Sequence, residues 1–160
     1  MFEKRTIITK LCSKFSVVLI MFTLLGCAVG DPYEFAKAKI PTLKPDMARI
    51  FVYRGFNPLA LLRPLVFKLD GKYIADSYAS TIFYHDVTPG KHLVNMASAK
   101  EDLLVNVSAG KTVFLRYSIV PDTISESNRI VELINSKTAQ AELKNVRLIK
   151  TELRHPDEVK

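Results

Sequence analysis

Residues 65–74 read Leu-Val-Phe-Lys-Leu-Asp-Gly-Lys-Tyr-Ile, and this stretch decides the fold. Its first, third and fifth residues are large and apolar, which is the two-residue period of a strand with one buried face. Asp70-Gly71 then predicts a two-residue hairpin turn, because both central positions of such a turn need a positive φ. The predicted cross-strand pairs are Leu69 with Lys72 and Phe67 with Ile74. The buried face thereby continues from one strand into the next.

Short runs of β-branched and aromatic residues, separated by turn residues, continue on both sides of this hairpin. Thr88-Pro89-Gly90-Lys91 has Pro and Gly at the middle positions of a type II turn and predicts a second hairpin. Its expected pairs are Val87 with His92, His85 with Val94, and Phe83 with Met96. The further strands are predicted at 50–53, 103–107, 112–119, 130–134 and 146–149. This pattern predicts an antiparallel β-sandwich of about seven to eight strands, with one short C-terminal helix over 137–144.

The N-terminus has the organisation of a secretory signal. Residues 1–14 hold four basic residues and one acidic residue, and the apolar run from Phe15 to Leu25 is too short to span a bilayer, which needs roughly 20 residues. The run ends in a tetrapeptide that resembles the lipobox of bacterial lipoprotein precursors. That tetrapeptide is Leu24, Leu25, Gly26 and Cys27. The sequence therefore predicts cleavage before Cys27 and lipid, palmitate included, on that residue.

This interpretation divides the chain into a signal peptide over 1–26, a lipidated tether over 27–47, a β-sandwich domain over 48–150 and a charged tail over 151–160. The tether is predicted as a loose, partly extended linker from its three prolines and the lack of a sustained hydrophobic period. The alternative is a helical turn or two over residues 33–39, with the two aromatic side chains docked on the domain or on lipid. Ala28 follows the cysteine, where an Asp resembles an inner-membrane retention signal. We therefore expect anchoring in the outer membrane with the domain in the periplasm, and leave inner-membrane anchoring open.

Charge and cysteine content narrow the function classes. The formal net charge is +7, of which +3 belongs to residues 1–26, so +4 remains over residues 27–160. No arginine-rich run or basic-aromatic motif accompanies this modest charge, and no nucleic-acid partner is expected. The two cysteines are Cys12, inside the signal, and Cys27. The mature chain is therefore expected to contain no disulfide.

Several motifs occur in an order that resembles a known family. Ala48 to Arg54 reads Ala-Arg-Ile-Phe-Val-Tyr-Arg, and an Asp-Gly turn, a Pro-Gly-Lys-His turn and an Ala-Gly turn follow. This order resembles the small bacterial lipoproteins catalogued as domain of unknown function 2846. It is also distantly similar to envelope β-domains named for a Pro-Glu-Gly-Ala motif. The resemblance implies a lipid-anchored, sandwich-like envelope domain and no established activity.

One cluster in the sequence offers candidate metal-binding or catalytic side chains, namely His85, Asp86 and His92. On the predicted hairpin the two imidazoles share one sheet face and could hold a metal with a third ligand. Asp86 points to the opposite face, and apolar neighbours favour histidines that simply pack in the sheet. No serine nucleophile motif or paired carboxylates are evident. We expect no catalytic residues, no metal and no cofactor, and so no enzyme.

The loop from Gly55 to Pro64 is unusually apolar for a connector. Either it forms a partner-docking or membrane-facing patch, or it covers one end of the sandwich. The candidate docking residues are Phe56, Leu59, Leu61 and Leu62. The first functional hypothesis is a non-catalytic interaction or scaffolding module with an envelope protein or peptidoglycan as partner. The alternative is a ligand- or carbohydrate-binding domain, which a concave, aromatic-lined cleft would favour.

Overall fold

The computed structural model describes residues 30–56, 64–97, 99, 101–121 and 127–151. Its elements, in chain order, are β1 (Asp31–Pro32), α2 (Tyr33–Ala36), the 3-10 helix η1 (Lys37–Lys39), β2 (Ala48–Arg54), β3 (Leu65–Leu69), β4 (Lys72–Ser77), β5 (Thr81–Val87), β6 (Gly90–Met96), β7 (Leu103–Val107), β8 (Thr112–Pro121), β9 (Ser127–Ile134), α3 (Ser136–Glu142), the 3-10 helix η3 (Leu143–Asn145) and β10 (Arg147–Leu148).

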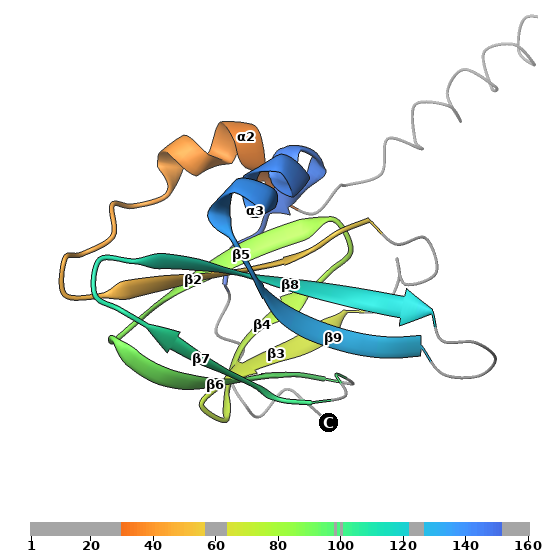
Figure 1. The fold of residues 1–160 in the computed structure, drawn as a ribbon. Coiled ribbons are helices and arrows are strands. Elements are labelled where there is room, and N and C mark those ends of the chain that lie inside the picture. The colour runs from red at the N-terminus through yellow and green to blue at the C-terminus, as the bar shows by residue number, and fades with distance from the viewer. Residues whose placement is uncertain (1–29, 57–63, 98, 100, 122–126, 152–160) are drawn as a thin grey trace, which may run out of the picture.

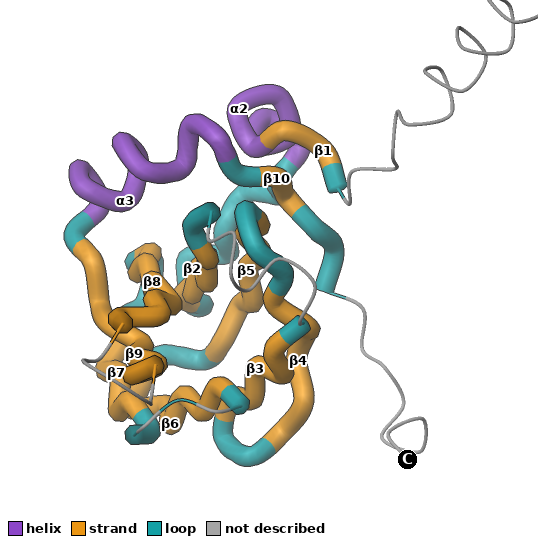
Figure 2. The backbone as a smooth tube through the Cα atoms, turned by 90° about the vertical axis from the view of Figure 1, so that its right-hand side faces the viewer, coloured by secondary structure: helices purple, strands orange, loops and turns teal. Residues whose placement is uncertain are grey.

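The strands form two sheets packed face to face, so the predicted β-sandwich is confirmed (Figure 1). Sheet A has the order β1-β10-β5-β2-β8-β9, and sheet B has the order β4-β3-β6-β7. Most neighbours are antiparallel, but β2 pairs with β8 and β10 pairs with β5 in parallel. The helices add a third layer on the outer face of sheet A, as Figure 2 shows edge-on.

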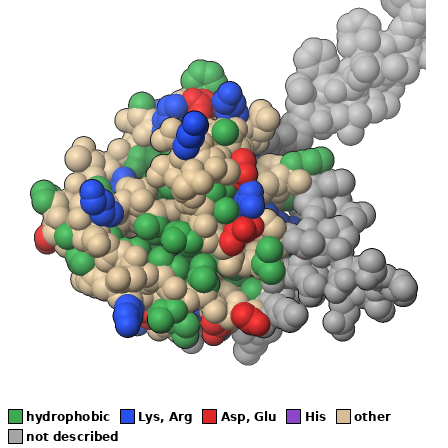
Figure 3. All heavy atoms as spheres, viewed as in Figure 1, with side chains coloured by type: hydrophobic (Ala, Val, Ile, Leu, Met, Phe, Trp, Pro, Cys, Tyr) green, Lys and Arg blue, Asp and Glu red, His purple; other side chains and the backbone are tan. Residues whose placement is uncertain are grey.

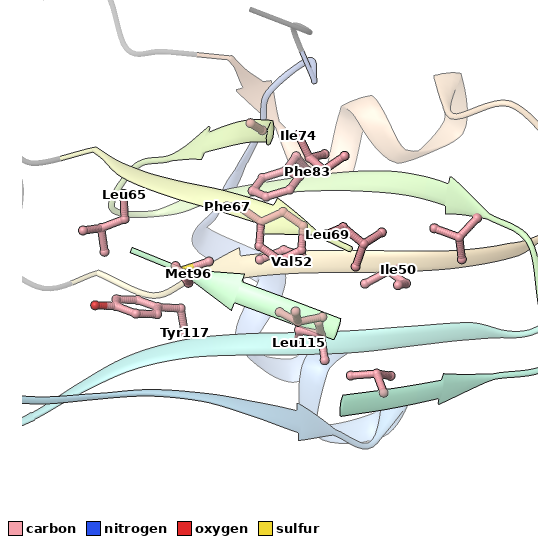
Figure 4. Packing of buried hydrophobic residues seen from close by; sticks show 14 of the residues in the cluster. Ile50, Val52, Leu65, Phe67, Leu69, Ile74, Phe83, Met96, Leu115 and Tyr117 are labelled. Carbon is pink, nitrogen blue, oxygen red and sulfur yellow. The ribbon is translucent and has the colours of Figure 1, made fainter. Parts of the chain in front are cut away.

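The core lies between the two sheets and follows the alternation of the strands. Residues of one parity from each strand point inward, where Phe67 and Phe83 pack edge to face with ring centroids 5.3 Å apart. Figure 4 shows this layer, with the labelled side chains converging from both sheets. Burying an aromatic or aliphatic side chain of this size stabilises the fold by about 2 kcal/mol.

A second core lies between sheet A and the helices. Residues of the other parity in β2 and β8 point into it, and Phe51 stacks on Phe114 at 5.2 Å. From α3 and η3, Ala139 and Leu143 are fully buried against this face, and the predicted C-terminal helix is confirmed. Asn135 caps α3 by accepting the Thr138 amide at 2.9 Å. All seven residues of β2 are buried because both cores cover that strand.

Within the predicted tether over 27–47, the structure favours the helical alternative for residues 33–39 over a loose linker, and residues 27–29 lie outside the described part. β1 adds to the edge of β10, and α2 packs beside η3. Ala36 is buried, and the ring of Tyr33 meets Phe51 edge-on at 6.3 Å. The Tyr33 amide also donates to the Val146 carbonyl at 2.9 Å. The folded unit therefore begins about where the tether was expected to begin, rather than at Ala48.

The first predicted hairpin forms between β3 and β4. Asp70 and Gly71 have φ values of 51° and 77°, as the turn requires, and Leu69 pairs with Lys72. The second predicted pair is wrong, because a register shift after Phe67 sets that residue opposite Ala75 instead of Ile74. Ile74 is the extra residue of this β-bulge, which bends the strand, and both Ile74 and Ala75 are buried in the core between the sheets.

The second predicted hairpin is wrong. β5 belongs to sheet A, where it pairs with β2 from Ala48↔Val87 to Arg54↔Thr81, whereas β6 belongs to sheet B and pairs with β3 and β7. The Thr88-Pro89 segment thus carries the chain from one sheet to the other. Turn chemistry is local, and here a seven-residue ladder with the central strand outweighs the tight reversal that the Pro-Gly pair favours.

Candidate functional site

The predicted lipid-anchor residues lie outside the described part of the chain. These are Leu24, Leu25, Gly26 and Cys27. Of the four candidate docking residues, Leu59, Leu61 and Leu62 also lie outside it, whereas Phe56 is 72% exposed. None of the helices in the described ranges is long and apolar enough to cross a bilayer.

The two histidines do not share one sheet face as predicted, because β5 and β6 belong to different sheets. His85 lies on the inner face of sheet A opposite Ile50, and His92 lies in sheet B opposite Val105. Burial lowers the pKa of His85, with Asp86 raising it and His92 lowering it further. Among the described residues, no three potential metal ligands are grouped closely enough to hold an ion.

His92 instead joins two turns. Its Nδ1 lies 2.6 Å from Asp70 Oδ2, and its Nε2 lies 2.8 Å from the Thr88 carbonyl oxygen. Both partners are acceptors, so both contacts are satisfied when the ring is a doubly protonated imidazolium. Burial lowers the pKa of His92, but the bonds to Asp70 and Thr88 outweigh it and leave the pKa raised. The bond from His92, then that from the Leu93 amide, lowers the pKa of Asp70.

Asp86 forms an ion pair with Arg49 on the outer face of sheet A, opposite to the face that carries His85. The guanidinium donates to both carboxylate oxygens, at 2.6 and 2.8 Å, and to the Pro41 carbonyl at 2.8 Å. It also lies 4.5 Å above the ring centre of Tyr84. Hydrogen bonding to Asp86 raises the pKa of Arg49. This bidentate, stacked arrangement stabilises the segment before β2 and the pairing of β2 with β5. The role of Arg49 and Asp86 is therefore structural.

The described residues enclose a cleft of about 810 Å³ at one open side of the sandwich. The edge strand β4 of sheet B contributes one wall, β5 and β10 of sheet A contribute another, and α2 with η1 covers it. Figure 2 shows β1, β10, β5 and β4 along this side of the molecule. Three tyrosines line it, namely Tyr73, Tyr78 and Tyr84.

The charged lining of the cleft is mixed. Asp31 and Asp76 contribute carboxylates, and Lys39 and Lys150 contribute ammonium groups. Lys39 is loosely paired, with its Nζ 4.0 Å from Asp31 and its side chain 78% exposed. β4 pairs only with β3 in the described sheets, so the backbone on its other side faces the cleft. The lining thus combines aromatic surface with hydrogen-bond donors and acceptors, as is typical of small-molecule binding sites.

Sequence reasoning missed this cleft. Its lining comes from residues 30–40, 73–84 and 148–151, and it exists because β10 joins the β5 edge of sheet A beside β4. The one available signal was the recurrence of tyrosine at positions 73, 78 and 84, in two neighbouring predicted strands and the turn between them.

Other exposed apolar side chains lie away from the cleft. Leu93 of β6 and Leu104 of β7 are cross-strand partners and are 43% and 60% exposed. On the edge strand β9, Leu133 is 57% exposed. Figure 3 shows hydrophobic side chains gathered on the face that carries β9 and β7. Such a patch is typical of a contact surface.

Comparison with known proteins adds no relative: no protein-family profile, no curated protein sequence and no solved structure matches this chain.

Proposed function

We propose that this protein is a lipid-anchored component of the bacterial cell envelope, and that its sandwich domain is a non-catalytic module that binds a saccharide-like ligand. The observation that carries the proposal is the tyrosine-lined cleft between β4, β5 and β10. The lipobox-like tetrapeptide ending at Cys27 supports the anchoring and the location. The order of motifs from Ala48 onward supports an envelope lipoprotein of the family that it resembles.

The chemistry of the lining favours a hydroxyl-rich ligand. The apolar faces of a sugar ring pack against aromatic side chains, while its hydroxyls need both donors and acceptors. Tyr73 and Tyr78 supply rings on the β4 side, and Asp76 supplies acceptor oxygens there. Lys39 at the end of η1 and Lys150 just after β10 supply donors. A volume of about 810 Å³ falls within the range of small-molecule pockets.

The test of ligand binding is a saccharide array probed with the full mature protein in detergent. Wild type is compared with Tyr73→Leu, which removes a hydroxyl-bearing ring from the cleft, and with Leu104→Ser, which changes an exposed side chain on β7. Binding that falls in Tyr73→Leu and persists in Leu104→Ser supports the cleft. Binding that responds equally to both substitutions, or no binding to any saccharide, rejects a carbohydrate ligand.

The anchor is tested separately by intact mass and membrane fractionation of wild type against Cys27→Ala. A diacylglyceryl mass on membrane-bound wild type, with a soluble or uncleaved variant, is the expected result. An unmodified, soluble wild type would remove the argument for location.

A second candidate function is protein docking or scaffolding, and the exposed pair Leu93–Leu104 favours it. Two large aliphatic side chains opposite each other on an uncovered sheet face form a small apolar contact area. In-cell crosslinking of wild type against Leu93→Ser/Leu104→Ser tests this role, with Tyr73→Leu as the control. Envelope-protein crosslinks lost from the double variant alone would support docking.

A further inference from the structure

The point at which the chain enters the fold is constrained by the backbone of β10. Gly30 has a φ of 81°, and a Cβ at that position would lie 2.3 Å from the Leu148 carbonyl oxygen. The Gly30 carbonyl also accepts a hydrogen bond from Arg147 Nε at 2.9 Å. Glycine is therefore needed both for the backbone conformation and for the close approach. Gly30 is held in place, and it lines the cleft.

The segment between this point and the predicted lipid anchor is very short. Cys27 precedes Gly30 by three residues. Because an extended chain spans at most about 3.6 Å per residue, the Cys27 Cα lies within roughly 11 Å of the Gly30 Cα. A lipidated Cys27 stays at the head-group level of the bilayer. The cleft of an anchored protein must therefore lie beside the membrane surface and not tens of ångströms away from it.

The side chains around this end of the cleft suit an anionic surface. Lys39 and Lys150 line it, Arg147 lies at Gly30, and Phe35 on α2 is 79% exposed. Basic side chains near anionic lipids are each attracted by about 1 kcal/mol, and exposed aromatic rings favour the interface. Asp31 offsets part of this charge through its loose contact with Lys39.

We propose that the cleft binds the anionic, hydroxyl-rich head group of a membrane lipid, an inference that rests on the proposed function. The phosphate lies between Lys39 and Lys150, and the hydroxylated ring packs against Tyr73 and Tyr78. The saccharide-like ligand of the proposed function is then the head group of a lipid. A peptidoglycan strand is a poorer occupant, because the segment from Cys27 to Gly30 is too short to carry the cleft away from the bilayer.

The test uses the full mature lipoprotein reconstituted in phosphatidylcholine vesicles with or without 10 mol % phosphatidylinositol, whose head group carries a phosphate and a six-membered polyol ring. Native mass spectrometry then counts the lipids that remain bound. The cleft variant is Lys39→Gln/Lys150→Gln. The matched control, Lys68→Gln/Lys91→Gln, removes the same charge from exposed positions of β3 and β6.

We expect wild type and the control to retain phosphatidylinositol in preference to phosphatidylcholine, and the cleft variant to lose about tenfold in that preference. Equal retention by the cleft variant and the control would overturn the proposal. So would a loss that tracks total charge in both variants, because that reports attraction to the vesicle surface rather than binding in the cleft.

A second measurement distinguishes binding of the head group in the cleft from the effect of anchoring the cleft close to the membrane. Soluble inositol 1-phosphate is titrated by NMR into the same protein in neutral detergent, alongside a variant with 20 Gly/Ser residues inserted between Ala28 and Val29. The insertion should leave this affinity unchanged but lower phosphatidylinositol retention several-fold, because it lowers the effective concentration. Unchanged retention would overturn the membrane-surface source. A wild type without a lipid mass would reject the anchor, whereas the soluble titration reports on the cleft alone.

Discussion

Replacing Asp70 by Asn should destabilise the protein in a pH-dependent way. The substitution keeps the turn, because Asn tolerates the φ of 51° as well as Asp does. It also keeps an oxygen for the Leu93 amide, which now lies 2.8 Å from Asp70 Oδ1. What it removes is the charge that faces the His92 ring at 2.6 Å.

The magnitude follows from this geometry. A hydrogen bond between charged groups stabilises a protein by about 1.5–3 kcal/mol when it is shielded from water. The His92 side chain is buried, but that of Asp70 is 48% exposed, so solvent screening reduces the expected loss to about 1 kcal/mol. The loss should appear in the free energy of unfolding at pH 5.5, measured by urea denaturation of residues 28–160 followed by circular dichroism.

The sign of the pH dependence follows from the two pKa shifts. The pKa of His92 is raised above 6.5 in the folded state, so its contribution is complete below pH 6.5 and disappears as pH rises through the folded value. The pKa of Asp70 is lowered below 3.8, so its contribution is present above pH 3.8 and disappears as pH falls through the folded value. The difference between wild type and Asp70→Asn should therefore be largest between pH 4 and 6.5.

At pH 9 the neutral His92 ring can accept from the new amide through Nδ1 and donate to the Thr88 carbonyl through Nε2, so the two proteins should be nearly equal in stability. A loss of the same size at pH 5.5 and pH 9 would refute the imidazolium assignment, because it would indicate a packing or turn effect. His92→Gln is the companion variant. In a double-mutant cycle with Asp70→Asn, the coupling should be close to 1 kcal/mol at pH 5.5 and absent at pH 9.

Three further substitutions are expected to lower the free energy of unfolding in the same urea assay. Gly30→Ala should cost about 2 kcal/mol because of its positive φ and its contact with β10, whereas Gly55→Ala, in open space, should change little. Arg49→Lys keeps the charge but loses the two-pronged contact with Asp86, at a cost of about 2 kcal/mol; an unchanged midpoint would show that the contact contributes nothing. Asn135→Ala removes the α3 cap and should cost about 1 kcal/mol, whereas Asn135→Asp should retain most of the stability.

Features that depend on neighbouring residues were predictable from the sequence. The Asp70-Gly71 turn carries its own backbone requirement, and the alternation around it identifies the buried face whichever strand pairs next. The C-terminal helix was predictable because Ala139 and Leu143 recur at a helical spacing behind a capping residue. The two-sheet architecture followed from the number and length of such segments.

Features that depend on the choice between distant partners were not predictable. The Pro89-Gly90 pair is compatible both with a hairpin and with a passage between sheets, and the decision lies in the ladder that β5 makes with β2. The four-residue helix α2 has too few residues to show a period, so the sequence offered it only as the alternative to a loose linker. It is stable because Tyr33 and Ala36 pack on the finished sheet. The cleft was not predictable for the same two reasons, because α2 and the edges of the two sheets form its walls.

The pairing of β1 with β10 also bears on how the chain completes its fold. Asp31 lies opposite Leu148, so nearly the whole domain separates two residues that are adjacent in the sheet. Contacts of such long sequence separation form slowly, because a large loop must close first. Until residues 147–148 arrive, the outer edge of β5 has no partner and presents unpaired backbone groups to other chains. A chain that ends before Arg147 would therefore expose a strand edge prone to aggregation, even though most of both cores could already have formed.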